Sequence, residues 1–180
     1  MLNKRTKILL TAFEPFGAND TNISQRMLDA IQADVTKLLL PVSFRRAPEV
    51  LNEAIKQFQP EVIISMGQAA EGDKIRLERL AINMMDSAKG DNDGYIPDEE
   101  IICPEAPLAL KTALPVKPLC ADCINAGLPT MVSNSAGLYV CNRIYWEALR
   151  YTEKALFVHL PKNMDESIAR QTIQKITSII

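Results

Sequence analysis

The order of short apolar runs along the chain is the feature that most constrains its fold. Runs rich in aliphatic residues predict β-strands at residues 7–12, 35–40, 61–66, 129–133 and 154–159. Amphipathic stretches lie between them and predict helices at residues 47–58, 115–126 and 165–180. Strands that alternate with helices favour a sheet covered on both faces. We therefore expect an α/β fold with three layers, α/β/α, around a twisted, mostly parallel central sheet.

Two stretches in the middle of the chain are less regular. Between residues 75 and 85 the apolar positions change parity near Glu78, which predicts a strand with a bulge or turn at that point. Residues 86–100 are rich in Asp, Gly and Pro and predict a surface loop that can border a site.

Length and charge exclude several classes of protein. The 180 residues, of which 47% are hydrophobic, suffice for a single domain spanning residues 1–180. The formal net charge of -2 gives no basic surface, so we expect neither a nucleic-acid partner nor a membrane partner. The basic start of the chain precedes an apolar run that Glu14 and Pro15 interrupt, too short for a signal peptide. We expect a cytoplasmic protein with reduced cysteines.

His159 is the only histidine, so any chemistry that needs an imidazole depends on it. It lies at the end of the apolar run 154–158, and Pro161 follows two residues later. This position predicts a side chain at the carboxyl end of a strand, where open α/β proteins bind ligands. A hydrogen-bonded structural histidine is the alternative, and position alone favours it unless a nucleophile and an orienting acid lie nearby.

Cys141 is the strongest candidate nucleophile among the cysteines. It follows the small-residue turn at 133–137 and opens a helical pattern, so it lies near a helix N-terminus. The helix dipole and unpaired N–H groups there favour a thiolate and can hold an oxyanion. A buried, inert thiol is the alternative. Cys120 and Cys123 form a mid-helix Cys-x-x-Cys pair, which leaves a thiol redox protein as a weaker hypothesis. With one histidine and no second cysteine pair, we expect no metal site.

Four stretches match the motifs of a known enzyme family, in that family's order. Residues 133–142 read Ser-Asn-Ser-Ala-Gly-Leu-Tyr-Val-Cys-Asn. The others are Thr-Ala-Phe-Glu-Pro-Phe-Gly at 11–17, Gly-Gln-Ala at 67–69 with Leu-Glu-Arg-Leu-Ala-Ile-Asn at 77–83, and Phe-Val-His-Leu-Pro at 157–161. Together they resemble the pyroglutamyl peptidase I family, the pyrrolidone-carboxylate peptidases, over nearly the whole chain.

The resemblance implies a cysteine exopeptidase, an omega peptidase that hydrolyses the N-terminal pyroglutamyl residue from peptides. It implies a Cys-His-Glu triad, a thioester intermediate and no cofactor, with Cys141 as nucleophile, His159 as base and Glu78 orienting the imidazole. A solvated ion pair with Arg76 or Arg79 is the alternative for Glu78. The resemblance also implies a cytosolic homo-oligomer, a dimer or tetramer.

The implied substrate carries a neutral lactam ring, which needs apolar walls and a few hydrogen bonds. By the resemblance, the residues around this ring are Phe13 and Phe16 on its two faces, Tyr139 and Val140 as further wall, and Gln68 and Asn22 as polar contacts. Ordinary core packing is the alternative for the two phenylalanines.

Two departures from the family pattern concern the surroundings of the triad. Residues 88–92 read Ala-Lys-Gly-Asp-Asn where the family has Ala-Arg-Ile-Pro-Asp-Asn, and Lys89 lacks the planar fork of arginine. Arg76 replaces a small hydroxyl residue two places before Glu78. The alternative function is therefore a catalytically weak or inactive relative that binds pyroglutamyl peptides, because its 88–92 loop is altered.

Overall fold

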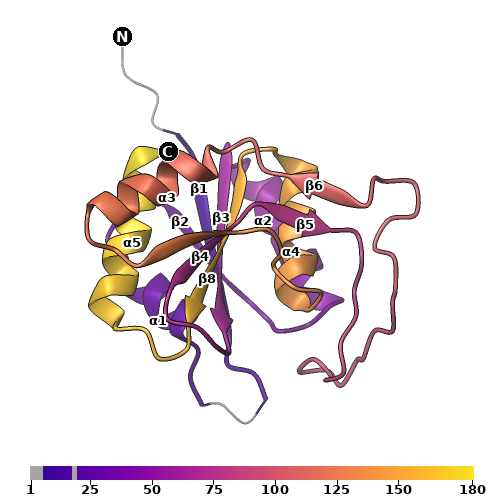
Figure 1. Cartoon of the computed structure of the whole chain (residues 1–180). Helices are drawn as coiled ribbons and strands as arrows, with labels where there is room; N and C mark the ends of the chain where they lie inside the picture. Colours follow the sequence, from indigo (N-terminus) through magenta and orange to yellow (C-terminus); the bar gives the residue numbers. More distant parts are fainter. Residues whose placement is uncertain (1–5, 18–19) are drawn as a thin grey trace.

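The computed structural model describes residues 6–17 and 20–180, and within these ranges six strands form one sheet (Figure 1). In spatial order the strands are β2 (Thr36–Leu40), β1 (Ile8–Phe13), β3 (Val62–Ala69), β8 (Ala155–Pro161), β4 (Ile75–Glu78) and β7 (Thr130–Ser133). Neighbouring strands of this described sheet are parallel except for β4 and β8, which are antiparallel. A separate antiparallel pair is formed by β5 (Leu80–Ile82) and β6 (Ala109–Lys111).

Helices cover both faces of the sheet (Figure 1). One face packs against α1 (Ile23–Ala30), α3 (Val116–Asn125) and α5 (Glu166–Ile179). The other packs against α2 (Arg46–Phe58) and α4 (Val140–Tyr151). The expected single-domain α/β fold with a mostly parallel central sheet is therefore confirmed.

The central strands are predominantly apolar because helices cover both of their faces. Every residue of β1 and of β8 is buried. The five predicted strands and three predicted helices are all present, with ends that differ by three residues or fewer. The largest difference is in β3, which continues through Gly67 and Gln68 to Ala69.

The predicted change near Glu78 is present, but it separates two strands and is not a bulge or turn within one strand. Two strands occupy this stretch, and they belong to different sheets. Arg79 links them, donating its N–H to the carbonyl of Ser133 at 2.8 Å and accepting from Thr112 N at 3.3 Å. The parity of the apolar residues changes because Leu77 packs under α3 and α5, whereas Ala81 packs under α4.

Two further elements, α1 and β6, were not predicted. The helix α1 begins after Asn22, whose side-chain oxygen accepts from Ser24 N at 3.0 Å and caps the helix. Its buried residues include Ile23, Met27 and Leu28, a helical stripe that the sequence offers in a short stretch. The predicted loop at 86–100 carries no helix or strand and extends beyond β5 and β6 at the right of Figure 1.

The topology brings several chain segments to one edge of the sheet. β1, β3 and β8 end at this edge, and β4 begins there because it runs the opposite way. Ligand sites of open α/β proteins lie at such an edge. Among residues 6–17 and 20–180, none of the helices combines the length and the apolar character needed to cross a membrane.

Candidate active site

Cys141 is the second residue of α4, and its sulfur lies directly against the sheet. A Cβ atom built on Gly67 of β3 would lie 2.9 Å from Cys141 Sγ and 2.8 Å from Phe157 Cζ. Contacts that short do not occur, so only glycine at position 67 lets the thiol approach the strand this closely. The turn before the helix uses Gly137 with φ of 80°, a left-handed conformation that suits glycine.

The first turn of α4 also carries unsatisfied N–H groups near the thiol of Cys141. Its N-cap residue, Tyr139, has an extended backbone, and within the described chain its side chain forms no capping hydrogen bond. The early N–H groups of a helix have no partner inside the helix, and its dipole adds partial positive charge there. The thiol of Cys141 therefore lies among donors that can bind a negatively charged oxygen.

His159 lies on the neighbouring strand, on the same face of the sheet as the thiol. Gly67 of β3 pairs with His159 of β8, and paired residues of neighbouring strands project to the same face. Adjacent strands are about 4.8 Å apart. The imidazole is only 7% exposed, and its ring centroid lies 4.8 Å from that of Phe157. The register thus brings the only histidine beside the candidate nucleophile.

Glu78 forms a buried hydrogen bond with this histidine. His159 Nδ1 lies 2.8 Å from Glu78 Oε1, and Glu78 is completely buried. If the carboxylate is ionised, Nδ1 carries the proton and Nε2 keeps the lone pair that a general base needs. Glu78 Oε2 is buried without a hydrogen-bond partner in the part of the chain that the structure describes. Glu78 is therefore not the solvated ion pair that Arg76 or Arg79 offered as an alternative.

Burial sets the protonation state of the thiol. Burial raises the pKa of Cys141 to about 12, and the charge of Glu78 adds to this shift. Its own backbone N–H and Arg76 lower the pKa, but by less. The backbone N–H at the helix N-terminus does favour the thiolate, as expected, but desolvation of the sulfur opposes it and is the larger effect. A base must take the thiol proton before or during attack.

A cavity opens next to Cys141 at the carboxyl edge of the sheet. It holds about 300 Å³ of empty volume, counting its open mouth. The residues that line it are Phe13, Phe16, Asn22, Val42, Gln68, Tyr139, Val140 and Cys141. The structure thus brings together all six residues that the resemblance suggested for the substrate. Val42 was missed, although it follows the carboxyl end of β2 and so lies at the same edge.

The polar lining residues differ in what they can offer a ligand. Asn22 uses both ends of its amide within the protein, accepting from Ser24 N at 3.0 Å and donating to the carbonyl of Glu14 at 3.0 Å. Gln68 Oε1 accepts from Ile23 N at 3.1 Å. Gln68 Nε2 has no protein partner among residues 6–17 and 20–180. The side-chain donor available in this cavity is therefore the amide of Gln68, whereas Asn22 shapes the wall.

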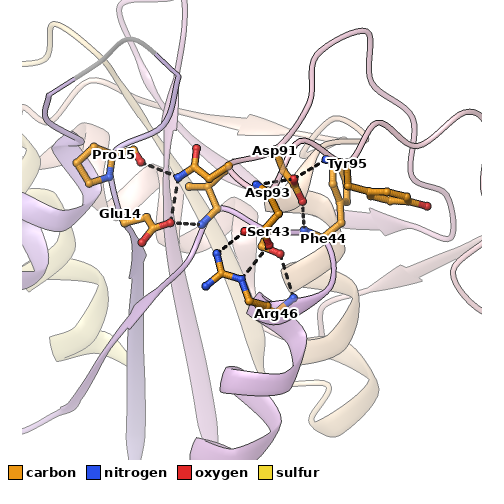
Figure 2. Close-up of polar contacts among 10 residues, drawn as sticks. Glu14, Pro15, Ser43, Phe44, Arg46, Asp91, Asp93 and Tyr95 are labelled. Atoms are coloured by element: carbon orange, nitrogen blue, oxygen red, sulfur yellow. Dashed lines mark hydrogen bonds and ion pairs between the residues drawn. The ribbon is translucent and has the colours of Figure 1, made fainter.

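The altered 88–92 segment is fixed against the cavity by hydrogen bonds (Figure 2). Asp91, only 8% exposed, accepts from Phe44 N at 2.8 Å. Asn92 Nδ2 donates to Glu14 Oε1 at 2.9 Å and to the carbonyl of Pro15 at 3.0 Å. These bonds tie the segment to the turn between the two pocket phenylalanines.

Three more contacts hold the same region. Glu14 Oε1 also accepts from Val42 N at 3.1 Å, and the Arg46–Asp93 ion pair closes the outer side at 2.6 Å (Figure 2). Tyr139 donates its hydroxyl to the carbonyl of Gly90 at 3.0 Å. Hydrogen bonds therefore hold residues 90–93 against the turn at Glu14, the Val42 backbone and Tyr139.

Asn142, directly after the thiol, is a positioning residue that sequence reasoning did not single out. It is fully buried, accepting from Ile82 N at 2.8 Å and donating to the carbonyls of Ile82 at 2.8 Å and Met84 at 3.0 Å. These bonds hold the first turn of α4 to the β5 segment. A polar residue on the apolar side of a helix was the signal available in the sequence.

The remaining cysteines have structural surroundings. All four cysteines are free thiols, and Cys120 and Cys123 are buried within α3. Cys120 Sγ lies 3.5 Å from Thr130 Oγ1, and burial raises the pKa of Cys123. These surroundings do not favour the redox hypothesis, because a reactive thiol needs access and a low pKa. In the described part of the chain, no group of three or more His, Cys, Asp or Glu side chains could hold a metal ion.

Comparisons with known proteins assign the chain to one enzyme family. The model of the family described as pyroglutamyl peptidase matches residues 6–178. A pyrrolidone-carboxylate peptidase of Thermococcus kodakarensis is 37% identical over 187 residues, covering 94% of this chain and 91% of that protein. One from Bacillus subtilis is 34% identical over 183 residues, covering 95% and 83%.

Solved structures of pyroglutamyl peptidases share the fold of this chain. The pyrrolidone carboxyl peptidase from Thermococcus litoralis superposes with a TM-score of 0.91 at 29% identity, covering 97% of this chain and 93% of that one. The pyroglutamyl peptidase I of Bacillus amyloliquefaciens gives a TM-score of 0.89 at 29% identity, covering 97% and 96%.

Proposed function

The chain belongs to the pyroglutamyl peptidase family and is an enzyme of this type, and from that premise we propose that it removes the N-terminal pyroglutamyl residue from peptides through Cys141, His159 and Glu78. The observation that carries the proposal is the buried 2.8 Å bond between His159 Nδ1 and Glu78 Oε1, one strand away from a thiol held against Gly67. A nucleophile, a base and an orienting acid in this order are the parts of a triad.

The cavity supports the choice of substrate. Its walls are mostly aromatic and aliphatic, and the charged groups nearest to it, such as Glu14, are occupied with protein hydrogen bonds. A pyroglutamyl ring is a neutral lactam, so an apolar slot with one or two hydrogen bonds suits it. Gln68 Nε2 is the group that would donate to the lactam carbonyl. A free amino terminus finds no carboxylate in the lining to pair with.

The proposed reaction begins with the neutral thiol of the resting site. His159 Nε2 takes the proton of Cys141 as Sγ attacks the carbonyl carbon of the pyroglutamyl residue. The carbonyl oxygen becomes an oxyanion, which the N–H groups in the first turn of α4 stabilise. Glu78 stabilises the imidazolium and holds its orientation.

The second half restores the enzyme. The tetrahedral intermediate collapses to a thioester, the C–N bond breaks, and His159 gives its proton to the leaving amine. Water, deprotonated by His159, then attacks the thioester carbon. Pyroglutamate leaves, and the proton returns to Sγ. Each proton taken by the imidazole is returned within the cycle, so the resting thiol is regenerated.

A chromogenic pyroglutamyl amide tests the proposal. Wild-type protein should release the chromophore, and Cys141→Ala and His159→Ala should each lower kcat/KM by roughly 10⁴-fold or more. Cys103→Ala is the matched control, because Cys103 contacts Asn83 through its backbone and lies away from the cavity lining. Mass spectrometry of an acid-quenched reaction should find the acyl group on Cys141. Folded wild-type protein without turnover would contradict the proposal.

Two finer expectations belong to the same proposal. We expect a cytoplasmic enzyme that forms a dimer or tetramer of identical chains. Fractionation of cells and light scattering on the purified protein measure the two properties.

A further inference from the structure

Arg76 is a charged residue beside His159 that the proposed reaction does not use. It pairs directly with His159 across β4 and β8, and it lies two positions before Glu78, on the same face of the sheet. The residue is half-buried. Its guanidinium forms no hydrogen bond or ion pair with any residue in the described ranges 6–17 and 20–180. Arg76 thus carries an unpaired guanidinium at the strand position that pairs with the proposed base.

The strand order places this charge on one definite side of the thiol. Gly67 of β3, His159 of β8 and Arg76 of β4 form one row across three neighbouring strands. The cavity for the pyroglutamyl ring lies at the other end of this row, toward Phe13 of β1 and Gln68 of β3. Arg76 is therefore separated from the ring cavity by the thiol and the imidazole.

The chemistry fixes which part of a substrate reaches Arg76. The acyl carbon bonds to Cys141 Sγ above Gly67, and the leaving nitrogen must meet His159 to receive its proton. The leaving group then continues over β8 toward β4. Strands spaced by about 4.8 Å put the Cα of Arg76 about 10 Å from that of Gly67, a span that a long side chain and one substrate residue fill together. Arg76 also lowers the pKa of Cys141, which indicates that its charge is near the thiol.

We propose that Arg76 binds a carboxylate of the residue that follows the pyroglutamyl group, and that it makes the free carboxyl terminus of a pyroglutamyl dipeptide the preferred leaving side. This inference rests on the proposed function. In a dipeptide the α-carboxylate is two bonds from the leaving nitrogen, N–Cα and Cα–C, so it falls on the path toward β4. The planar guanidinium fork matches a carboxylate in two parallel hydrogen bonds. Partial burial limits the screening of such a pair by water and salt.

Matched substrate pairs measure the preference. The first pair is pyroglutamyl-alanine and its C-terminal amide, which differ only in the α-carboxylate. The second pair is the C-terminal amides of pyroglutamyl-glutamate and pyroglutamyl-glutamine, which differ only in that the glutamate has a free side-chain carboxylate. For wild-type protein we expect kcat/KM to favour the free dipeptide by about tenfold over its amide, the range of one charge-assisted contact.

Variants assign the preference to Arg76. Arg76→Gln should reduce the dipeptide-to-amide ratio to about one. Because the ratio compares two substrates of one variant, any effect of the lost charge on the thiol itself cancels. Arg76→Lys should keep part of the ratio, because it retains the charge and loses the fork. Arg150→Gln is the control for net charge, since Arg150 is exposed in the last turn of α4, far along the helix from Cys141. It should keep the full ratio.

The outcomes separate this inference from the proposed function. A ratio on either pair that disappears in Arg76→Gln supports it and identifies which carboxylate is bound. Equal rates within both pairs overturn it, although amide hydrolysis would still stand. A dipeptide-to-amide ratio that stays unchanged in Arg76→Gln also overturns it, because the preference would then arise elsewhere. Absence of hydrolysis of all four substrates by the wild type would overturn the proposed function and the inference together.

Discussion

Replacing Gly67 by alanine should displace the thiol of Cys141 without removing it, and so tests whether the position of the sulfur matters for activity. The added Cβ would lie 2.9 Å from Cys141 Sγ and 2.8 Å from Phe157 Cζ. Non-bonded heavy atoms prefer separations of about 3.5–4.0 Å, so the sulfur and the ring must each move by roughly 0.6 Å or more. Neither can move freely, because Phe157 is fully buried and Cys141 is fixed in the first turn of α4.

The displacement predicts two measurable losses. A misplacement of about 1 Å in a reacting group can cost about 100-fold in rate, so we expect kcat/KM to fall by a factor on that order. Overpacking a core costs about 1–3 kcal/mol. For a domain of this length each kcal/mol lowers Tm by about 2–4 °C, so Tm should fall by several degrees.

A second substitution distinguishes the two contacts. Adding Phe157→Leu to Gly67→Ala removes the ring atoms that meet the new Cβ and should restore part of the stability lost to overpacking. It leaves the contact with Cys141 Sγ, so activity should stay low relative to Phe157→Leu alone. Chromophore release and thermal unfolding measure the two effects. Wild-type rate and Tm in Gly67→Ala would refute the close approach of the thiol to β3.

Three further predictions follow from the site. Glu78→Gln should lower kcat/KM by about 10⁴-fold, as loss of a triad carboxylate does. The pKa of Cys141 should fall in the same variant, because a charge that raises it is gone. Thiolate absorbance measures this pKa, and an unchanged or higher value would contradict the prediction. The folded-state pKa of Cys141 is raised from 9.0 to about 12, so its contribution to stability is complete below pH 9 and is lost as pH rises toward 12. Unfolding free energies of wild type and Cys141→Ala should therefore converge above pH 9, by about 1.4 kcal/mol per pH unit, and parallel pH curves would refute the shift. Tyr139→Phe removes the hydrogen bond to the Gly90 carbonyl and keeps the ring contacts. KM should therefore rise by about 2- to 10-fold with little change in kcat. A fall in kcat alone would contradict a role of this bond in substrate binding.

Regular elements with strong patterns could be predicted from the sequence. The strands β1 and β8 are predominantly apolar because both of their faces are covered, and such runs are visible in any single sequence. The division of residues 75–85 between two sheets could not be predicted. A change of parity looks the same whether the strand bulges or ends, and only packing under α4 decides between them.

The candidate site followed from motifs, and its arrangement followed from the fold. All the residues that line the cavity except Val42 were named by the resemblance, and the structure brings them to one hollow. Their catalytic and binding roles stay predictions. Val42, Gly67 and Asn142 were missed because their importance lies in what they touch: Val42 completes the wall, Gly67 gives room to the sulfur, and Asn142 holds the helix start.

The sequence by itself determined the chemical groups, namely one imidazole, a thiol after a small-residue turn, and a carboxylate in a third motif. Only the tertiary structure decided that His159 and Glu78, 81 positions apart, form a buried hydrogen bond. It also adds the desolvation of the sulfur, which opposes the thiolate. The sequence predicts a helix end that favours a thiolate, but the pKa of Cys141 rises to about 12. Desolvation depends on how distant segments pack around the sulfur, and no local pattern in a sequence contains that information.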